Sequence, residues 1–357
     1  MKQVAHVASA SMIEVSVLIS TYNRAPRLRT ALAALLGQTG DVRYEVIVID
    51  NNSSDDTAGV VAEMAAASPD RIRYVFEGRQ GKSHALNTGL TLARGEILAF
   101  TDDDVRVAPD WLLQFRRSFT AHPAVDYIGG RVLPEWLAPA PRWLSTAHWS
   151  PLALQDYGDA LQSVGADRAV CLVGANIAYR RAVFAQVGGF TPALGRTGDG
   201  IGSTEDHDLQ LRMWRAGMRG LYDPATLVHA DVTADRLTRE YHRRWHRGHG
   251  HHCALMRLRE LVPADLGPMS EPPGIVTLFG TPAFVYLDVP RNAYLCLRSF
   301  VLRKDPLFYA NQLRHVLSYI ATGYRQFRCR GRSNSTVELL RFARSYAGHR
   351  WARRTAH

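Results

Sequence analysis

The stretch Ile97-Leu98-Ala99-Phe100-Thr101-Asp102-Asp103-Asp104 runs from a short apolar segment directly into three adjacent carboxylates. An apolar run of this length predicts a buried strand. Ligands of open α/β sheets bind beyond the carboxyl ends of strands, so the aspartates are expected where a ligand would lie. Two carboxylates about 4 Å apart repel by roughly 4 kcal/mol at an effective dielectric of about 20, and a divalent cation would reverse this repulsion. The alternative is a solvated acidic turn that caps the following helix.

Alternating β-branched and helical patterns surround this stretch and predict an α/β fold with a mostly parallel sheet flanked by helices. We expect strands at 15–20, 44–50, 71–76, 97–101, 125–132 and 171–179. Helices are expected from Pro26 to about Gly37 with Asn23 as cap, from the cap cluster at 51–56 to about Ala67, and at 83–93, 107–120 and 205–216. The segment between the strands at 125–132 and 171–179, rich in Pro and Trp, is expected to be irregular. Beyond residue 238 the chain is expected to be helical and basic.

A second acidic motif, Gly202-Ser203-Thr204-Glu205-Asp206-His207-Asp208, precedes apolar residues at the spacing of a helix core face. Its carboxylates are candidates for proton transfer. The alternative is that Ser203 or Thr204 caps the helix, while Glu205 and Asp206 only favour its dipole.

Together these motifs resemble family 2 glycosyltransferases of the GT-A fold. The resemblance extends over about residues 13–250 and is carried by several segments in order: 21–24 (Thr-Tyr-Asn-Arg), 50–57 (Asp-Asn-Asn-Ser-Ser-Asp-Asp-Thr), 81–89, 102–104 and 204–206. It implies a catalytic domain at 13–250. The basic composition of the remaining chain predicts a helical extension at 251–357 that can associate with a membrane. The resemblance also implies that a hexosyl group is transferred, with inversion, from a nucleotide-diphosphate sugar to a hydroxyl acceptor. A UDP-sugar is the first expected donor. The acceptor is expected to belong to polysaccharide or glycolipid synthesis of the cell envelope.

The resemblance also assigns roles to individual residues. Asp206 is the general base, and Glu205 is a neighbour that orients the acceptor. Asp104, Asp102 and His229 are expected to hold Mn²⁺ or Mg²⁺. The residues expected to bind the nucleotide sugar are Thr21, Tyr22, Arg24, Asp50, Asn52, Lys82, Asn87, Asp102, Asp103, Asn176 and Arg244.

Several of these positions have a structural alternative. Asp50 ends an apolar strand and can accept the imide N–H of uracil, or it can cap the next helix. Lys82 and Asn87 lie near a helix start that suits a phosphate, although Asn87 can also be a packing residue. Asn176 is as well explained as a polar residue within a strand, and a lone histidine such as His229 is usually structural.

His242 and His246 fall on one helical face and suggest a zinc site. No acidic or cysteine partner has ligand spacing nearby, so this interpretation is weak. The region resembles the Arg/Trp-rich helix of the family only loosely, and a single-addition enzyme is favoured over a processive one.

Composition limits the remaining possibilities. The 357 residues have a net charge of +10, and from Arg291 onward there are fourteen Lys/Arg against two acids. No secretory signal and no apolar run of about 20 residues is evident, so we expect a cytoplasmic protein without a spanning helix. We expect 274–324 to form amphipathic helices on the anionic inner face of the membrane. The alternative is a helical subdomain packed on the catalytic core.

Three other functions are compatible with parts of the sequence. A basic nucleic-acid-binding protein is disfavoured because the acidic crevice would repel a polyanion, so no nucleic-acid partner is expected. A dinucleotide-dependent oxidoreductase is disfavoured because no G-x-G-x-x-G turn follows the first strand. A GT-A-like protein that binds nucleotide sugars or anionic polymers without catalysis is the remaining alternative.

Overall fold

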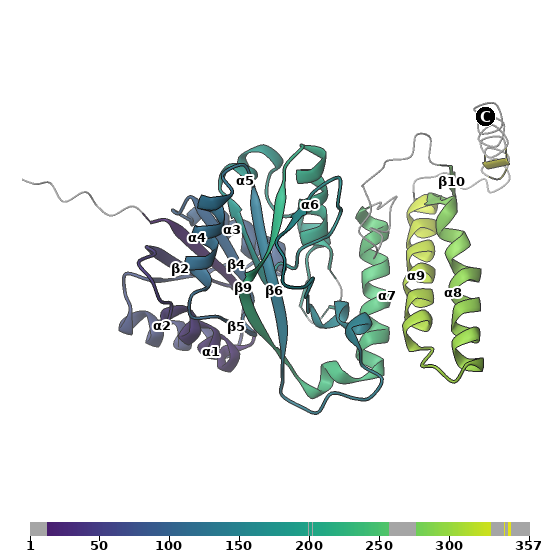
Figure 1. Ribbon diagram of the computed structural model, residues 1–357, viewed down its shortest axis with the longest axis horizontal. Coiled ribbons are helices and arrows are strands. Elements are labelled where there is room, and N and C mark those ends of the chain that lie inside the picture. The colour runs from purple at the N-terminus through teal and green to yellow at the C-terminus, as the bar shows by residue number, and fades with distance from the viewer. Residues whose placement is uncertain are drawn as a thin grey trace, which may run out of the picture.

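The computed structural model describes residues 13–256, apart from 199 and 202, together with residues 276–329 and the positions 339, 342 and 343. Gly202 of the second acidic motif and Gly274 of the expected amphipathic segment lie outside the described residues. The main sheet of the described chain has the strand order β3-β2-β1-β4-β8-β6-β9-β5, with β7 paired to β9. It is a mixed α/β fold with helices on both faces (Figure 1).

The first part of the sheet is the expected parallel unit. Strands β1 (Val15–Thr21), β2 (Tyr44–Asp50), β3 (Ile72–Phe76) and β4 (Ile97–Thr101) pair in parallel and alternate with helices α1 (Ala25–Leu36), α2 (Thr57–Ala67) and α3 (Lys82–Leu92). Every residue of β2 is buried, as expected for a strand covered on both faces. Parallel strands end at the same edge, so the polar segments after β1, β2 and β4 meet there.

The second part of the sheet is mixed. It contains β5 (Val105–Val107), β6 (Tyr127–Trp136), β7 (Gln162–Val164), β8 (Asn176–Arg180) and β9 (Gly220–Val232), and its helices are α4 (Trp111–Ala121), α5 (Ala182–Val187) and α6 (Glu205–Arg215). Strand β8 runs antiparallel to both β4 and β6, whereas β6 and β9 are parallel. Short 3₁₀ turns occur at Thr146–His148, Ser150–Leu152, Pro192–Leu194 and Ala234–Leu237.

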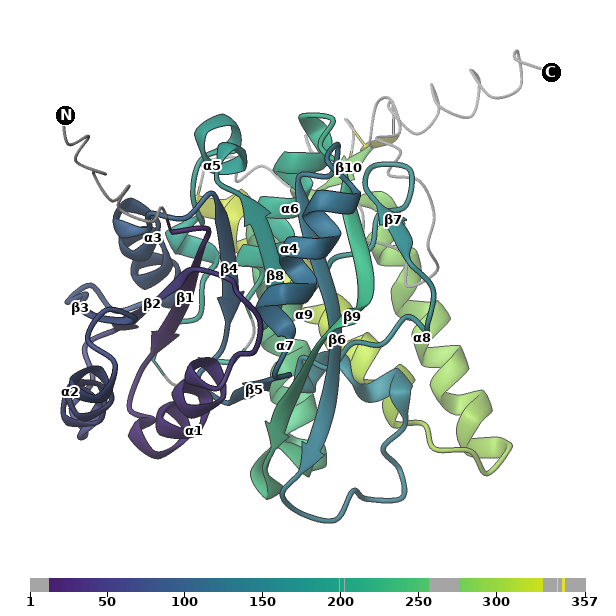
Figure 2. The same cartoon turned by 60° about the vertical axis from the view of Figure 1, so that its left-hand side comes forward.

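Two apolar layers cover the sheet. Leu28 and Leu32 of α1 and Phe115 of α4 are buried on one face, and Leu86 of α3 and Leu209 of α6 are buried on the other. Figure 2 shows α4 lying across the front of the sheet. The layers hold the sheet between them and leave its carboxyl edge open for a site.

Two expected strand boundaries were wrong. Strand β6 continues through Pro134 to Trp136, because beyond Gly129 its ladder runs only to β9, and a proline without an N–H is tolerated where one side lacks a ladder. Strand β8 begins only at Asn176. The N–H groups of Leu172, Val173 and Gly174 instead donate to the side chains of Gln210, Gln155 and Asp206.

Three long helices follow the sheet. Helix α7 (Arg239–Met256) packs against α9 (Leu307–Cys329), and α8 (Ala283–Val301) packs on the far side of α9, as Figure 1 shows. A short hairpin of β10 (Thr277–Leu278) and β11 (Thr281–Pro282) precedes α8. In the described part of the chain, no helix is both long and apolar enough to cross a membrane.

Candidate active site

A cavity of about 370 Å³ lies at the carboxyl edge of the sheet. Its wall combines residues from both acidic motifs: Asp102, Asp103 and Asp104 follow β4, and Glu205 and Asp206 begin α6. The two groups of carboxylates therefore face one shared space. Had they faced separate surfaces, the enzymatic interpretation would have failed.

Each carboxylate of the triplet is paired with a basic side chain. Lys82 Nζ lies 2.8 Å from Asp102 Oδ1, and Arg24 Nη1 lies 2.9 Å from Asp103 Oδ1 and 3.1 Å from Asp104 Oδ2. Arg236 approaches the same Asp104 oxygen at 3.5 Å. The basic groups offset the repulsion among the three acids and are themselves suited to bind phosphate oxygens.

Asp103 is the most enclosed member of the triplet. Its second oxygen accepts a hydrogen bond of 2.7 Å from Thr21 Oγ1. Burial raises the pKa of Asp103 to about 6, although Arg24 acts in the opposite direction. Asp102 and Asp104 flank it on the cavity wall.

Lys82 links the triplet to the second acidic motif electrostatically. Burial would lower the pKa of Lys82, but Asp102, Glu205 and Asp206 together raise it above its ordinary value. Burial and the adjacent Glu205 raise the pKa of Asp206 to about 7, despite the opposing effect of Lys82. A carboxyl group with this pKa can accept a proton near neutral pH, which is the property that a general base needs.

The position of Asp206 depends on the segment before β8. The N–H of Gly174 donates to Asp206 Oδ2 at 3.2 Å, and a Cβ built on Gly174 would lie 2.4 Å from the same oxygen. A glycine is therefore required for the backbone to approach the carboxylate this closely. Glu205 is buried beside it, and its Oε2 has no hydrogen-bond partner among the described residues.

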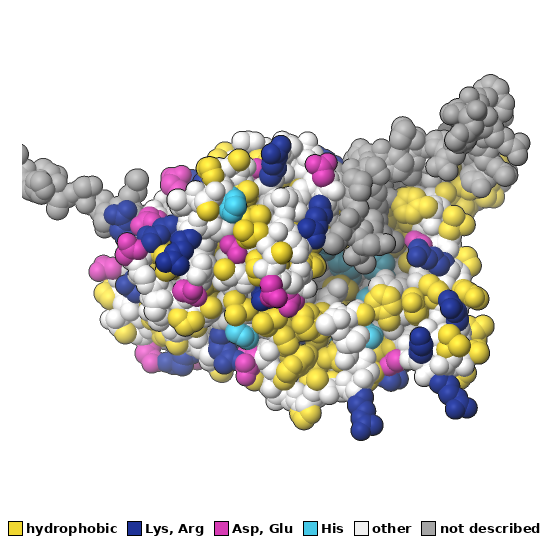
Figure 3. All heavy atoms as spheres, viewed as in Figure 1, with side chains coloured by type: hydrophobic (Ala, Val, Ile, Leu, Met, Phe, Trp, Pro, Cys, Tyr) yellow, Lys and Arg dark blue, Asp and Glu magenta, His cyan; other side chains and the backbone are white. Residues whose placement is uncertain are grey.

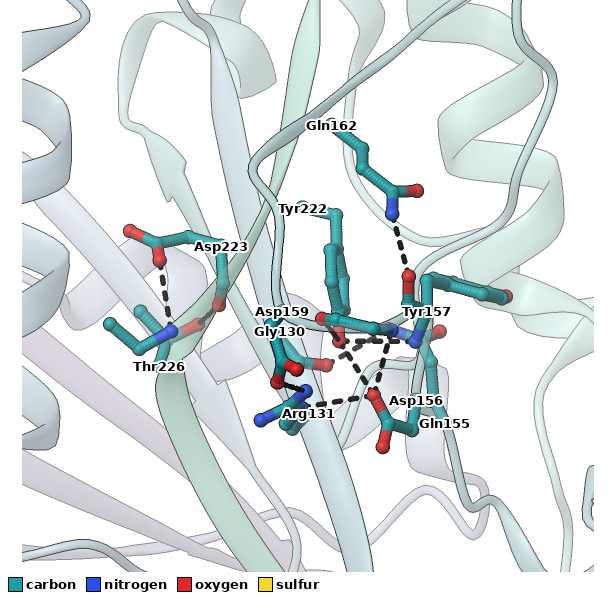
Figure 4. Close-up of polar contacts among 12 residues, drawn as sticks. Gly130, Arg131, Gln155, Asp156, Tyr157, Asp159, Gln162, Tyr222, Asp223 and Thr226 are labelled. Atoms are coloured by element: carbon teal, nitrogen blue, oxygen red, sulfur yellow. Dashed lines mark hydrogen bonds and ion pairs between the residues drawn. The ribbon is translucent and has the colours of Figure 1, made fainter.

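The opposite wall of the cavity contains Pro151, Leu152 and Ala153, and the loop that continues from it is held by the network in Figure 4. Arg131 of β6 bonds Asp156 and Asp159, and its Nε lies 2.9 Å from Asp156 Oδ1. The backbone of Tyr157 donates to the hydroxyl of Tyr222 on β9 at 3.1 Å. These bonds fix the loop to the sheet and thereby define that side of the cavity.

The structure brings Thr21, Tyr22, Arg24, Lys82 and the acidic residues together on the cavity wall. Asp50 and Asn52 are not part of this lining. Asp50 is buried behind it, where its oxygens accept hydrogen bonds from Ser53 N and Tyr74 Oη. Asn52 is exposed in the turn after β2.

Asn87 and Asn176 are engaged in hydrogen bonds within the protein. Asn87 exchanges two hydrogen bonds of 2.8 Å with the backbone of Phe190. Asn176 is fully buried, accepts from Trp111 Nε1 and donates to the carbonyl groups of Arg131 and Thr226. Its amide therefore cannot reach a sugar hydroxyl without breaking these bonds.

His229 and Arg244 also lie outside the cavity lining. His229 alternates along β9 with the buried Val228 and Ala230, so its side chain points to the other face of the strand. Arg244 is exposed on α7, and the neighbouring Tyr241 and Trp245 line the cavity instead.

Three residues of the cavity lining were not among the predicted site residues: Arg236, Tyr241 and Trp245. Arg236 lies in the turn after β9 and stacks over the ring of Tyr241 at 5.8 Å. The loose Arg/Trp-rich pattern did indicate α7, because Trp245 lines the cavity, whereas Arg244 is exposed and lies outside the lining.

The chemistry of the triplet fits a divalent cation held jointly with a ligand. Among the residues that the structure describes, no three His, Cys, Asp or Glu side chains form a group that could hold a metal ion. Mg²⁺ and Mn²⁺ are commonly bound by one or two carboxylates plus substrate phosphates, so Asp102 and Asp104 suffice on the protein side. His229 lies outside the cavity lining that contains these two residues.

The zinc interpretation of α7 has no support in the structure. His242 is fully buried and packs edge-on against Trp143, with ring centroids 5.0 Å apart. Burial lowers the pKa of His242 to about 4 and that of His246 to about 3. These neutral imidazoles are packing residues between α7 and its neighbours.

Comparisons with known proteins agree with this architecture. Residues 16–188 match the family described as "Glycosyl transferase family 2". The chain is 25% identical over 221 residues to a glucosyl-dolichyl phosphate glucuronosyltransferase of Haloferax volcanii, covering 60% of this chain and 68% of that protein. It is 27% identical over 229 residues to the succinoglycan biosynthesis protein ExoM of Rhizobium meliloti, covering 63% of this chain and 69% of the relative. Several further relatives are matched over only 28–39% of their own length.

A solved structure shares the fold. The mannosyltransferase PcManGT from Pyrobaculum calidifontis, in complex with GDP-Man and Mn²⁺, superposes with a TM-score of 0.58 at 20% identity and covers 87% of this chain and 86% of its own. Residues 16–188 therefore form a glycosyltransferase family 2 domain, and the protein is a glycosyltransferase with a GT-A fold.

Proposed function

We propose that the protein transfers a sugar from a nucleoside-diphosphate sugar to a hydroxyl group of a lipid-linked or glycan acceptor, with inversion at the anomeric carbon. The observation that carries this proposal is the shared cavity. It combines a diphosphate-binding set of charges after β4 with a carboxyl group of raised pKa at the start of α6.

The donor end of the cavity is the region around the triplet. Arg24, Lys82 and Arg236 present cationic groups there, and each already contacts an aspartate. In the proposed reaction they turn toward the diphosphate and stabilise the charge that develops as the nucleoside diphosphate leaves. A divalent cation held by Asp102 and Asp104 would supply further neutralisation of that leaving group.

Asp206 is the proposed general base. It takes the proton from the acceptor hydroxyl as the acceptor oxygen forms a bond to the anomeric carbon. The bond between that carbon and the diphosphate oxygen breaks in the same displacement, and its electron pair leaves with the nucleoside diphosphate. The N–H of Gly174 holds Asp206 at the cavity wall. Burial and the nearby Glu205 carboxylate raise the pKa of Asp206, and the Gly174 hydrogen bond opposes them.

The acceptor class follows from the relatives and the charge of the chain. The Haloferax volcanii relative is named for a dolichyl phosphate acceptor, and a net charge of +10 suits an anionic lipid or membrane surface. We therefore include a polyprenyl phosphate or diphosphate acceptor and peripheral contact with a membrane in the proposal. The screen described next identifies the sugar and the nucleobase of the donor.

The test is a screen of nucleotide sugars with Mn²⁺ or Mg²⁺ and polyprenyl-linked acceptors, scored by release of nucleoside diphosphate. Proton NMR of the product gives the configuration at the new linkage. The proposal predicts acceptor-dependent release and an inverted anomer. Retention of configuration, or full activity in the presence of a chelator, would require a different mechanism.

A further inference from the structure

Helix α8 buries few of its side chains against the rest of the protein. Of its 19 residues, only Val285 and Ser299 are buried. It contacts α9 and the short β11 strand and forms the outermost layer of the helical region (Figure 1). Most of its surface therefore faces outward.

The outward face of α8 is apolar along its whole length. Leu287, Pro290, Tyr294, Leu297 and Val301 follow a spacing of three and four residues, which places them on one side of a helix. Leu287 and Val301 are each 70% exposed, and Tyr294 and Leu297 are each 63% exposed. Phe300, which is 72% exposed, and Leu302 extend the patch at the C-terminal end. Large contiguous apolar patches of this kind mark interaction surfaces rather than ordinary solvent-facing surface.

The exposed charges around this face are mostly basic, and the acid that follows them, Asp305, lies 3.5 Å from Arg239. Arg291, Arg298, Arg303 and Lys304 are exposed on α8 or directly after it. The single acid within α8, Asp288, is part-buried and lies 3.8 Å from Arg291. Figure 3 shows hydrophobic and basic side chains gathered at the end of the molecule where Figure 1 places α8.

We propose that α8 is a membrane-docking helix that lies flat on an anionic lipid surface. Its apolar face enters the boundary between headgroups and acyl chains, while Arg291 and Arg298 contact lipid phosphates at the flank. The cationic border favours an anionic membrane over an apolar protein groove, because the exposed charged side chains within α8, Arg291 and Arg298, are both basic. Helix α9 would then separate the membrane surface from α7 and the catalytic sheet.

This inference locates the membrane contact that belongs to the proposed function, but it does not require catalysis. Binding is therefore measured on the full chain without donor or acceptor. The protein is floated with vesicles of phosphatidylcholine mixed with phosphatidylglycerol, and in parallel with vesicles of phosphatidylcholine alone. Failure of binding alongside normal sugar transfer would refute the docking surface and leave the proposed reaction intact.

The test variant is Leu287→Glu/Tyr294→Glu/Val301→Glu. All three side chains are exposed, so the changes remove apolar surface and add negative charge without disturbing the protein interior. We expect binding to the anionic vesicles to fall by roughly tenfold or more. Circular dichroism and the melting temperature establish that the variant is folded.

The matched control is Phe76→Glu/Leu137→Glu/Leu161→Glu, which replaces three large apolar side chains that are exposed elsewhere, again with Glu. Its binding should equal that of the wild type within about twofold, apart from the small general effect of added negative charge. If the two triple variants bind alike, or if the wild type does not float with anionic vesicles, the inference is wrong.

A second pair of measurements separates the roles of charge and self-association. Arg291→Gln/Arg298→Gln should reduce the preference for phosphatidylglycerol while retaining the apolar contribution. Sedimentation equilibrium without vesicles tests the other occupant, a second copy of the chain. A dimer that dissociates in the α8 triple variant, together with absent vesicle binding, would show that α8 is a subunit interface and would overturn the membrane assignment.

Discussion

The ammonium nitrogen of Lys82 lies 2.8 Å from Asp102 Oδ1, so one side chain at the start of α3 is paired with the acidic triplet after β4. The same ammonium group is also influenced by Glu205 and Asp206 at the start of α6. Lys82 thus lies between the proposed donor site and the proposed base, and its charge acts on both.

Replacing Lys82 with Met should lower kcat by roughly 10²- to 10³-fold, because a positive charge near the developing diphosphate is lost. The change should also move the acidic limb of the kcat/KM profile to higher pH, since Lys82 holds down the pKa of Asp206. Lys82→Arg keeps the charge and should leave the limb close to its wild-type position. If the acidic limb of the kcat/KM profile lies at the same pH in Lys82→Met as in the wild type, the electrostatic effect of Lys82 on Asp206 is contradicted.

Glu205→Gln should move the acidic limb of the kcat/KM profile to lower pH. The Glu205 carboxylate raises the pKa of Asp206, which is about 7 in the folded protein. A base must be ionised to act, so kcat/KM falls below this pKa by about tenfold per pH unit, and a lower pKa extends activity to more acidic solution. The matched control is Asp208→Asn, which removes a carboxylate from the same helical turn, where it pairs with Arg212. A limb that shifts equally in both variants would mean that Glu205 has no specific effect.

Gly174→Ala should impair the chemical step while leaving nucleotide binding intact. The added methyl group would lie 2.4 Å from Asp206 Oδ2 and must displace the carboxylate. Displacements of about 1 Å can reduce rates by about 10²-fold, and we expect a loss of this order in kcat. Gly165→Ala is the control, because its Cβ would meet only the Met218 carbonyl oxygen at 3.8 Å. Equal activity of the two alanine variants would show that the Gly174 contact is unimportant.

Asn176→Ala tests a structural role against the sugar contact that its sequence position suggested. The buried amide holds Trp111 and the carbonyl groups of Arg131 and Thr226, so its removal should lower the free energy of unfolding by about 2–4 kcal/mol. The urea midpoint should fall while the m-value stays constant, and the KM for the donor should change little. Unchanged stability with a raised donor KM would restore the sugar-binding interpretation.

Much of the fold was predictable because its first half is built from local patterns. The run Ile97–Thr101 and the apolar segment Val46–Ile49 specify buried strands by composition alone, and parallel pairing places Asp102–Asp104 at the carboxyl edge. The start of α6 at Glu205 was equally clear, because two acids precede a helix-spaced apolar face.

The roles of single polar residues were less predictable because they depend on tertiary contacts. Whether Asn176 faces a ligand or Trp111 is decided by the packing of α4 on β8, more than 60 residues apart in sequence. The side on which His229 emerges depends on the register of β9, since a shift by one residue reverses the face. Arg236 enters the cavity from a turn that carries no motif.

The central claim is that one cavity binds the cation and diphosphate at the triplet and activates the acceptor at Asp206. The most direct test combines calorimetric binding of nucleoside diphosphate with Mn²⁺ and single-turnover sugar transfer, using Asp104→Asn and Asp206→Asn. Asp206→Asn should bind the nucleotide with wild-type affinity and show no transfer, whereas Asp104→Asn should lose both properties. Transfer at the wild-type rate by Asp206→Asn, or undiminished metal-dependent binding by Asp104→Asn, would contradict the account.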